Sequence, residues 1–190
     1  MGLGRGLLLR MFGRPRGSLG RLGGAVMART NRAAAQWVVG VLEPRAGDRV
    51  LEVGFGPGVA IEILAQAPAR RVAGVDPSIE MIRQARARNG AAIAEGRIEL
   101  RQSSAERLPF ADASFDRALA INSMQVWSDA DAGLRELNRV LRSGGSLALG
   151  FTVHSGQQRT GVAERMTAAG FAEPRIISTE AAFCALATKP

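Results

Sequence analysis

The sequence predicts an α/β fold, a mostly parallel sheet doubly wound by helices on both faces, and three observations support this. From residue 50 onward, short apolar runs alternate with segments of helical periodicity, as in sheets whose parallel strands are joined by helices. The apolar run 50–53 ends in a glycine-rich turn that begins a helix. The last two β runs, 175–178 and 183–187, are too close together for a crossover connection, so they must pair antiparallel.

A basic arm and a helix precede the first strand. Residues 1–28 combine arginine with glycine and have no sustained period, so we interpret them as an arm outside the folded domain, which spans residues 29–190. Residues 29–42 have helical periodicity, and their apolar stripe must pack on the rest of the domain. The stripe consists of Ala34, Trp37, Val38 and Val41.

Between the strands, the pattern predicts further helices. One follows Gly58, and another starts near Pro77, buries Ile79 and ends at Asn89–Gly90, a pair typical of a left-handed helix end. The next begins near Asp129, a typical N-cap residue. This helix ends at Gly144–Gly145, and a short last helix covers 162–170. With 50–53 and the C-terminal pair, the strands number seven; the others are 71–76, 98–102, 118–122 and 146–152.

The formal net charge of +8 belongs to one end of the chain. Residues 1–42 contain seven arginines and no acidic residue, whereas the remainder contains 18 basic and 17 acidic residues. The folded body is therefore nearly neutral and offers no basic stripe, which argues against nucleic acid as a partner and favours a small molecule.

Cysteine and histidine are rare in this chain. Cys184 is the only cysteine, so no disulfide can form within the chain, and a reducing, cytoplasmic location is the simpler expectation. With one histidine and no Cys/His cluster, we expect no metal site. No apolar stretch approaches the roughly 18 residues that a membrane-spanning helix needs.

The glycine-rich turn indicates the kind of ligand. Gly54, Gly56 and Gly58 let the backbone turn sharply and approach a ligand without a Cβ in the way. A dinucleotide-binding turn needs its third small residue at position 59, where this chain has valine. Pro57 also lacks an N–H where a pyrophosphate needs donors. A nucleoside ligand without a pyrophosphate fits this turn better.

A carboxylate at the end of the second apolar run supports a nucleoside. Asp76 lies 18 residues beyond Gly58, close to the spacing of about 20 that is typical of an acid that binds ribose hydroxyls. An alternative is that Asp76 only starts the following helix, with Pro77 in its first turn. The spacing suits several adenosine cofactors and does not choose among them.

The third motif runs from Ser103 to Asn122 and reads Ser-Ser-Ala-Glu, Leu-Pro-Phe, Ser-Phe-Asp and an apolar strand. In this order, the three motifs resemble those of the class I S-adenosylmethionine (SAM)-dependent methyltransferases, in the small-molecule, methyltransferase type 11-like branch. The resemblance covers about residues 35–190. The family commonly has Asp at position 104, so Ser104 departs from its pattern and offers adenine a hydrogen bond without charge.

The resemblance implies a Rossmann-like fold and SAM as the cofactor. The glycine turn would lie under the methionine part, Glu52 would anchor its amino group, Asp76 would hold the ribose, and Asn122 would face the methyl-transfer site. Alternatively, Glu52 is a buried acid satisfied by backbone donors, and Asn122 closes a strand. The residues expected to bind the cofactor are Glu52, Gly54, Gly56, Pro57, Gly58, Asp76, Pro77, Ser104, Ala105, Glu106 and Asn122.

The acceptor side is less constrained. Gln125 and Trp127 lie where relatives place substrate-facing residues, although an aromatic residue before a helix is as often part of the core. His154 follows the strand 146–152 at the ligand-binding edge and is the candidate general base, or else a solvated loop histidine. The helix 29–42 and the arm before it are candidates for a lid over the acceptor.

Three other functions stay open from sequence alone. The chain could be a nicotinamide-dependent oxidoreductase, which Pro57, residue 59 and the antiparallel end disfavour. It could be a nucleic-acid methyltransferase or binding protein that uses the arginine arm. It could also bind SAM without turnover.

Overall fold

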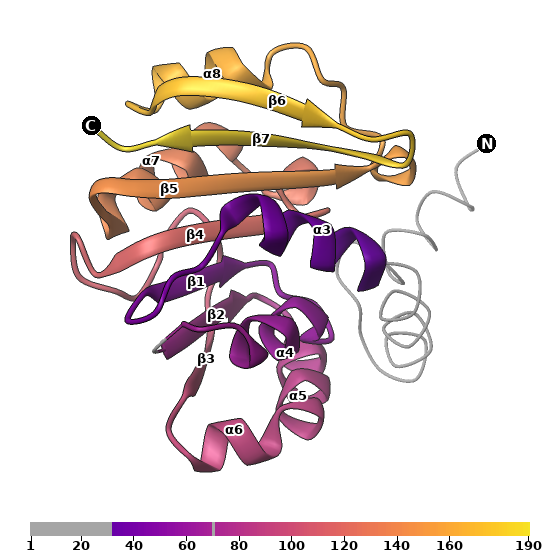
Figure 1. Cartoon of the computed structure of the whole chain (residues 1–190), viewed down its shortest axis with the longest axis vertical. Helices are drawn as coiled ribbons and strands as arrows, with labels where there is room; N and C mark the ends of the chain where they lie inside the picture. Colours follow the sequence, from indigo (N-terminus) through magenta and orange to yellow (C-terminus); the bar gives the residue numbers. More distant parts are fainter. Residues whose placement is uncertain (1–31, 70) are drawn as a thin grey trace.

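The computed structural model describes residues 32–69 and 71–190, and this part of the chain forms one seven-stranded sheet (Figure 1). Its strands are β1 (Arg49–Val53), β2 (Arg71–Asp76), β3 (Ile98–Gln102), β4 (Phe115–Ile121), β5 (Leu141–Thr152), β6 (Ala172–Ser178) and β7 (Ala182–Thr188). The strand order is β3-β2-β1-β4-β5-β7-β6, with β1 to β5 parallel and β7 antiparallel to both of its neighbours. The predicted fold class, including the C-terminal hairpin, is confirmed.

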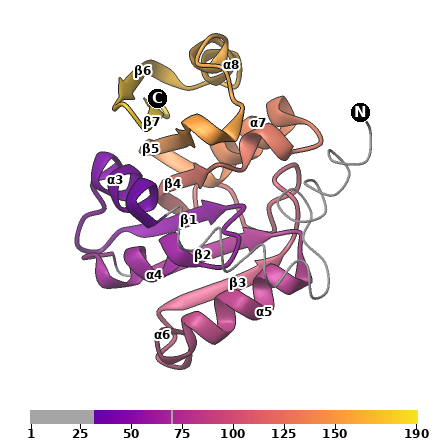
Figure 2. The ribbon, with the colours of Figure 1, turned by 90° about the vertical axis from the view of Figure 1, so that its right-hand side faces the viewer.

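Helices cover both faces of the sheet, and each face has its own apolar core. The helices are α3 (Arg32–Leu42), α4 (Val59–Gln66), α5 (Ile79–Arg88), α6 (Gly90–Ala94), α7 (Ala130–Val140) and α8 (Val162–Ala168). Buried residues of α3, α4 and α5 share one core cluster, and those of α7 and α8 share the other. Figure 2 shows α7 and α3 on opposite sides of the sheet.

Helix α3 packs on the sheet, and its most buried residues lie one position further along the chain than the predicted stripe: Ala35, Val38, Val39 and Leu42. Val38 was itself predicted, and Trp37 and Val41 of the predicted stripe are partly buried against the same core. Val38 fills the space over Gly150 of β5, where an added Cβ would lie 2.3 Å from the Val38 Cγ2. Most of α3 is therefore part of the core. The predicted arm over residues 1–28 lies outside the described residues.

The helix after β2 lies where it was predicted, but the expectations of a buried Ile79 and of a left-handed helix end were wrong. Ile79 is 49% exposed instead of buried, because the helix turns Met81 toward the core and leaves Ile79 on the outside. Ser78, whose Oγ accepts a hydrogen bond from the Met81 N–H at 3.4 Å, is the N-cap. Asn89 has a φ of −110°, not a left-handed value, and the chain continues directly into α6.

Later predictions were mostly confirmed. Asp129 caps α7 by accepting a hydrogen bond from the Ala132 N–H at 2.9 Å. The helix ends at Val140, before the predicted Gly144–Gly145, because Leu141 already begins β5. Cys184 is fully buried in the core, and this burial raises the pKa of its thiol to about 12.

Candidate functional site

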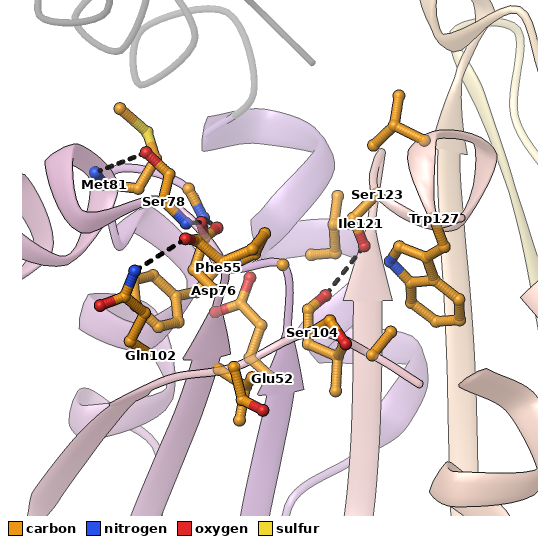
Figure 3. Close-up of a pocket in the computed structure, with 18 of the residues that line it drawn as sticks. Glu52, Phe55, Asp76, Ser78, Met81, Gln102, Ser104, Ile121, Ser123 and Trp127 are labelled. Carbon is orange, nitrogen blue, oxygen red and sulfur yellow. Dashed lines mark hydrogen bonds between the residues drawn. The ribbon is translucent and has the colours of Figure 1, made fainter. Parts of the chain in front are cut away.

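A cavity of about 790 Å³ opens at the carboxyl ends of β1, β2 and β4 (Figure 3). Parallel α/β sheets bind ligands at this edge, because the loops after the strands converge there. Most of the predicted site residues line this cavity: Glu52, Gly54, Gly56, Pro57, Asp76, Pro77, Ser104, Ala105, Glu106, Asn122 and Trp127.

Three predicted site residues do not line it. Gly58 is the N-cap of α4 and packs toward α5, where an added Cβ would lie 2.7 Å from the Ala85 Cβ. Gln125, in the 3-10 helix Met124–Val126, is half-buried, and its Oε1 has no partner among the described residues. His154, in the 3-10 helix Val153–Ser155, is exposed. The structure thus gives His154 no contact with the cavity.

The glycine turn is held in a conformation that other residues rarely adopt. Gly54 and Gly56 have φ values of 75° and 53°. The Gly54 N–H donates to the carbonyl of Val75 at 2.7 Å, so the turn leaves β1 bound to β2. An added Cβ at Gly54 would lie 2.4 Å from the Ser123 Cβ. Glycine is therefore required there both by backbone conformation and by space.

Helix α5 fixes the outer side of this turn. The Arg88 Nε donates to the carbonyl of Pro57 at 3.0 Å, and the Asn89 Nδ2 donates to the carbonyl of Gly58 at 3.2 Å. Arg88 also pairs with Glu62 of α4 at 3.4 Å. The carbonyl groups of the turn thus point toward α5 and away from the cavity. Sequence reasoning missed this pair, because nothing local marks a contact across 31 residues.

Asp76 ties the glycine turn to the end of β2. Its two carboxylate oxygens accept hydrogen bonds from the Gly56 N–H at 2.9 Å and the Ser78 N–H at 2.8 Å. Only 6% of the residue is exposed. Burial raises the pKa of the Asp76 carboxyl to about 6, although the two backbone donors act in the opposite direction. Ser78 caps the helix, so Asp76 has a different role.

Glu52 is a buried acid next to Asp76. It is 2% exposed, and its Oε2 has no hydrogen-bond partner among the described residues. Desolvation raises the pKa of Glu52 well above its usual value, and the charge of Asp76 raises it further, while the Ile61 N–H lowers it. Figure 3 shows the two acids close together at the ends of their strands. An unpartnered buried oxygen that lines a cavity is suited to accept a donor from a ligand.

The loop after β3 forms the opposite wall. Ala105 is buried, while Ser104 is exposed and donates its hydroxyl to the Glu106 carboxylate. Burial acts to raise the pKa of Glu106, but hydrogen bonds from Ser104 and from the Asp129 and Ser128 N–H groups outweigh it and lower the pKa. Glu106 therefore joins this loop to the start of α7.

The residues after β4 have structural roles as well as a place in the cavity. The Asn122 Oδ1 accepts a hydrogen bond from the Thr152 N–H at 2.8 Å and so joins β4 to β5. Trp127 packs over Gly133 of α7, where an added Cβ would lie 2.6 Å from its ring. Each of these residues makes a structural contact and also lines the cavity.

Several lining residues were not predicted. Ser123 has no sequence signal beyond its place after a strand, and its Oγ donates to the Val53 carbonyl at 2.8 Å. Ile79 was expected in the core, and Val126 carries no motif. The structure also places Ala35, Phe55, Met81, Arg83, Gln102 and Ile121 in the lining.

The described part of the chain shows neither a metal-binding cluster nor a membrane-spanning helix. Within residues 32–69 and 71–190, no group of three or more His, Cys, Asp or Glu side chains is placed to hold a metal ion. In the same part of the chain, no helix is long and apolar enough to cross a membrane.

The fold and the cavity define a class of protein: a doubly wound α/β domain with an acid-lined cavity at the carboxyl edge of the sheet and a reversed final strand. Comparison with known proteins identifies the family. A family model described as "Methyltransferase domain" matches residues 51–149. The chain belongs to the class I SAM-dependent methyltransferases and is an enzyme of that type with SAM as its cofactor.

Individual relatives support this assignment. The "Uncharacterized methyltransferase YdaC" of Bacillus subtilis is 30% identical over 129 residues, which are 67% of this chain and 69% of that protein. The "27-O-demethylrifamycin SV methyltransferase" of Amycolatopsis mediterranei is 37% identical over 60% of this chain and 42% of its own. The "O-methyltransferase resE" of Aspergillus sclerotiorum is also 37% identical, over 57% of this chain and 41% of its own. The chain thus spans less than half the length of the last two.

Solved structures share the fold. A SAM-dependent methyltransferase from Aquifex aeolicus superposes with a TM-score of 0.76 at 18% identity, covering 88% of this chain and 98% of that one. A methyltransferase in complex with the Trm112 activator of Haloferax volcanii gives 0.77 at 20% identity, covering 90% and 94%.

Proposed function

We propose that this enzyme transfers the methyl group of SAM to a small molecule bound in the same cavity. The observation that carries the proposal is that two acids, Glu52 and Asp76, lie next to each other beside the glycine turn, in a cavity of about 790 Å³. Ligand pockets span roughly 300–1,000 Å³, so this volume is large enough for a cofactor and a small acceptor together.

The residues present fit the cofactor. The turn at Gly54 and Gly56 offers a surface without Cβ atoms, and the unpartnered Glu52 Oε2 is an acceptor suited to the amino group of the methionine part. Each Asp76 oxygen accepts one backbone bond and keeps a lone pair for a ribose hydroxyl. Pro57, Pro77, Ser104, Ala105 and Glu106 would surround the base.

When bound, SAM supplies an electrophilic methyl group on a sulfonium, and the protein's part is chiefly to place the acceptor and exclude water. Asn122, fixed by its bond to Thr152, and Trp127, packed on α7, give the acceptor end a rigid wall. The only histidine, His154, does not line the cavity. We therefore infer that positioning contributes more than proton removal by a histidine.

Calorimetry tests this proposal with SAM, S-adenosylhomocysteine, NAD and a short RNA at moderate salt. We expect SAM and S-adenosylhomocysteine to bind and NAD to give no measurable heat, because Pro57 offers no N–H to a pyrophosphate. Binding of NAD without SAM would overturn the proposal. Strong, salt-dependent RNA binding would instead favour a nucleic-acid acceptor.

The contact between α5 and the glycine turn yields a second prediction. Arg88→Met removes the donor to the Pro57 carbonyl and loosens the turn, so SAM affinity should fall about three- to tenfold, the value of one ordinary, partly solvated hydrogen bond. Arg86→Met, on an exposed side of the same helix, is the matched control and should leave affinity unchanged. Arg88→Lys should recover part of the loss. Equal losses in both Met variants would show that charge, not the contact, matters.

A further inference from the structure

The rim of the cavity carries exposed apolar side chains on two sides. Ile79, after β2, is 49% exposed and Val126, after β4, is 41% exposed, and both line the cavity. Among the described residues, the two other large apolar side chains with comparable exposure are Val153, just after β5 at the same edge, and Ile176. Exposed apolar side chains that border a cavity mark a surface that a ligand covers.

The ionisable side chains that line the cavity are mostly acidic. The acids that line it are Glu52, Asp76, Glu80 and Glu106. The one cationic lining residue that the described part of the chain provides is Arg83. Its side chain is 72% exposed and lies 4.0 Å from the Glu80 carboxylate. Within residues 32–69 and 71–190, four acids therefore face one exposed arginine in this lining.

The polar groups at the acceptor end are engaged with the protein. The Asn122 Oδ1 accepts bonds from Thr152, and the Ser123 hydroxyl donates to the Val53 carbonyl. The surface that remains for a ligand on that side is largely apolar. It is formed by the aliphatic side chains of Ala35, Ile121 and Val126 and by the ring of Trp127.

From the apolar rim and the acidic lining, we propose that the acceptor is an uncharged, apolar small molecule and that the site discriminates against anionic acceptors. This inference rests on the proposed function. Hydrophobic contact with Val126 and Trp127 at the acceptor end provides the affinity, and the acidic side chains that line the cavity disfavour a negative group.

A matched pair of probes tests the inference: 4-hydroxyacetophenone and 4-hydroxybenzoate have nearly the same shape and differ by one negative charge. Binding of each is measured by calorimetry to the complex with S-adenosylhomocysteine. We expect the ketone to bind at least about tenfold more tightly than the carboxylate, as one like-charge contact near a protein surface predicts. In Val126→Lys, which places a cation on the rim, this ratio should shrink at least about fivefold.

Val153→Lys is the control, because it adds the same charge at the same edge outside the lining, and it should leave the ratio unchanged. Equal or tighter binding of the carboxylate to the wild-type complex would overturn the inference, as would failure of the ketone to bind at millimolar concentration. Failure of S-adenosylhomocysteine itself to bind would instead count against the proposed function, so the two failures are distinguishable.

Discussion

Gly54→Ala should abolish most of the SAM affinity and also destabilise the fold. An alanine at a φ of 75° costs roughly 1–2 kcal/mol. The new Cβ would also lie 2.4 Å from the Ser123 Cβ, and such overpacking costs about 1–3 kcal/mol more. Ser123 cannot move freely, because its hydroxyl is bound to the Val53 carbonyl. The turn must therefore shift, and SAM affinity should fall by tenfold or more, as about 1 Å of misplacement can cost 10²-fold.

Gly156→Ala separates the two causes. Gly156 has a φ of 74°, almost the same as Gly54, but an added Cβ there would meet nothing within 4 Å. In this variant the free energy of unfolding, measured by heat or urea, should fall only by the backbone cost of roughly 1–2 kcal/mol. Its SAM affinity should equal that of the wild type. If both variants lose the same stability and neither loses affinity, the contact with Ser123 does not hold the turn.

The general shape of the fold could be predicted because the signals were local and repeated. Alternation of apolar runs with helical periodicity, and the short link before β7, determine the sheet without knowledge of distant contacts. The lining of the cavity was predictable for the same reason, since Glu52, Gly54, Gly56 and Asp76 lie at fixed spacings at the ends of two consecutive strands.

What could not be predicted depends on contacts between distant segments. The stripe of α3 was displaced by one residue because distant contacts, such as that of Val38 with Gly150 more than a hundred residues away, determine which face of the helix meets the sheet. Ile79 looked like a core residue because the periodicity of a short helix does not show which turn faces solvent. Ser123 and Arg88 carry no motif, and only the folded chain shows that they hold the glycine turn from either side.

Asp76→Asn should weaken SAM binding by about 1.5–3 kcal/mol, the range for hydrogen bonds to a charged group. The amide oxygen can still accept one of the two backbone bonds, from Gly56 or Ser78, so the apo protein should stay folded, which makes Asn a cleaner test than Ala. Asp129→Asn, which alters the N-cap of α7 outside the lining, is the control and should leave affinity intact. Unchanged SAM affinity in Asp76→Asn would show that Asp76 only supports the turn.

The pH dependence of stability and of SAM affinity, compared between the wild type and Asp76→Asn, gives a second test of the Asp76 carboxylate. The pKa of Asp76 is about 6 in the fold against an ordinary value of 3.8, so between these pH values the folded state holds a proton that the unfolded state has lost. The stability of the apo protein should therefore fall as pH rises from about 4 to 6, by at most about 1.4 kcal/mol per unit, relative to Asp76→Asn. SAM affinity should change the opposite way, because the ionised carboxylate is the stronger acceptor for ribose hydroxyls. Thermal unfolding and calorimetry at pH 5 and 7.5 measure both; an apo stability that rises with pH relative to the variant would mean that Asp76 is not desolvated in solution.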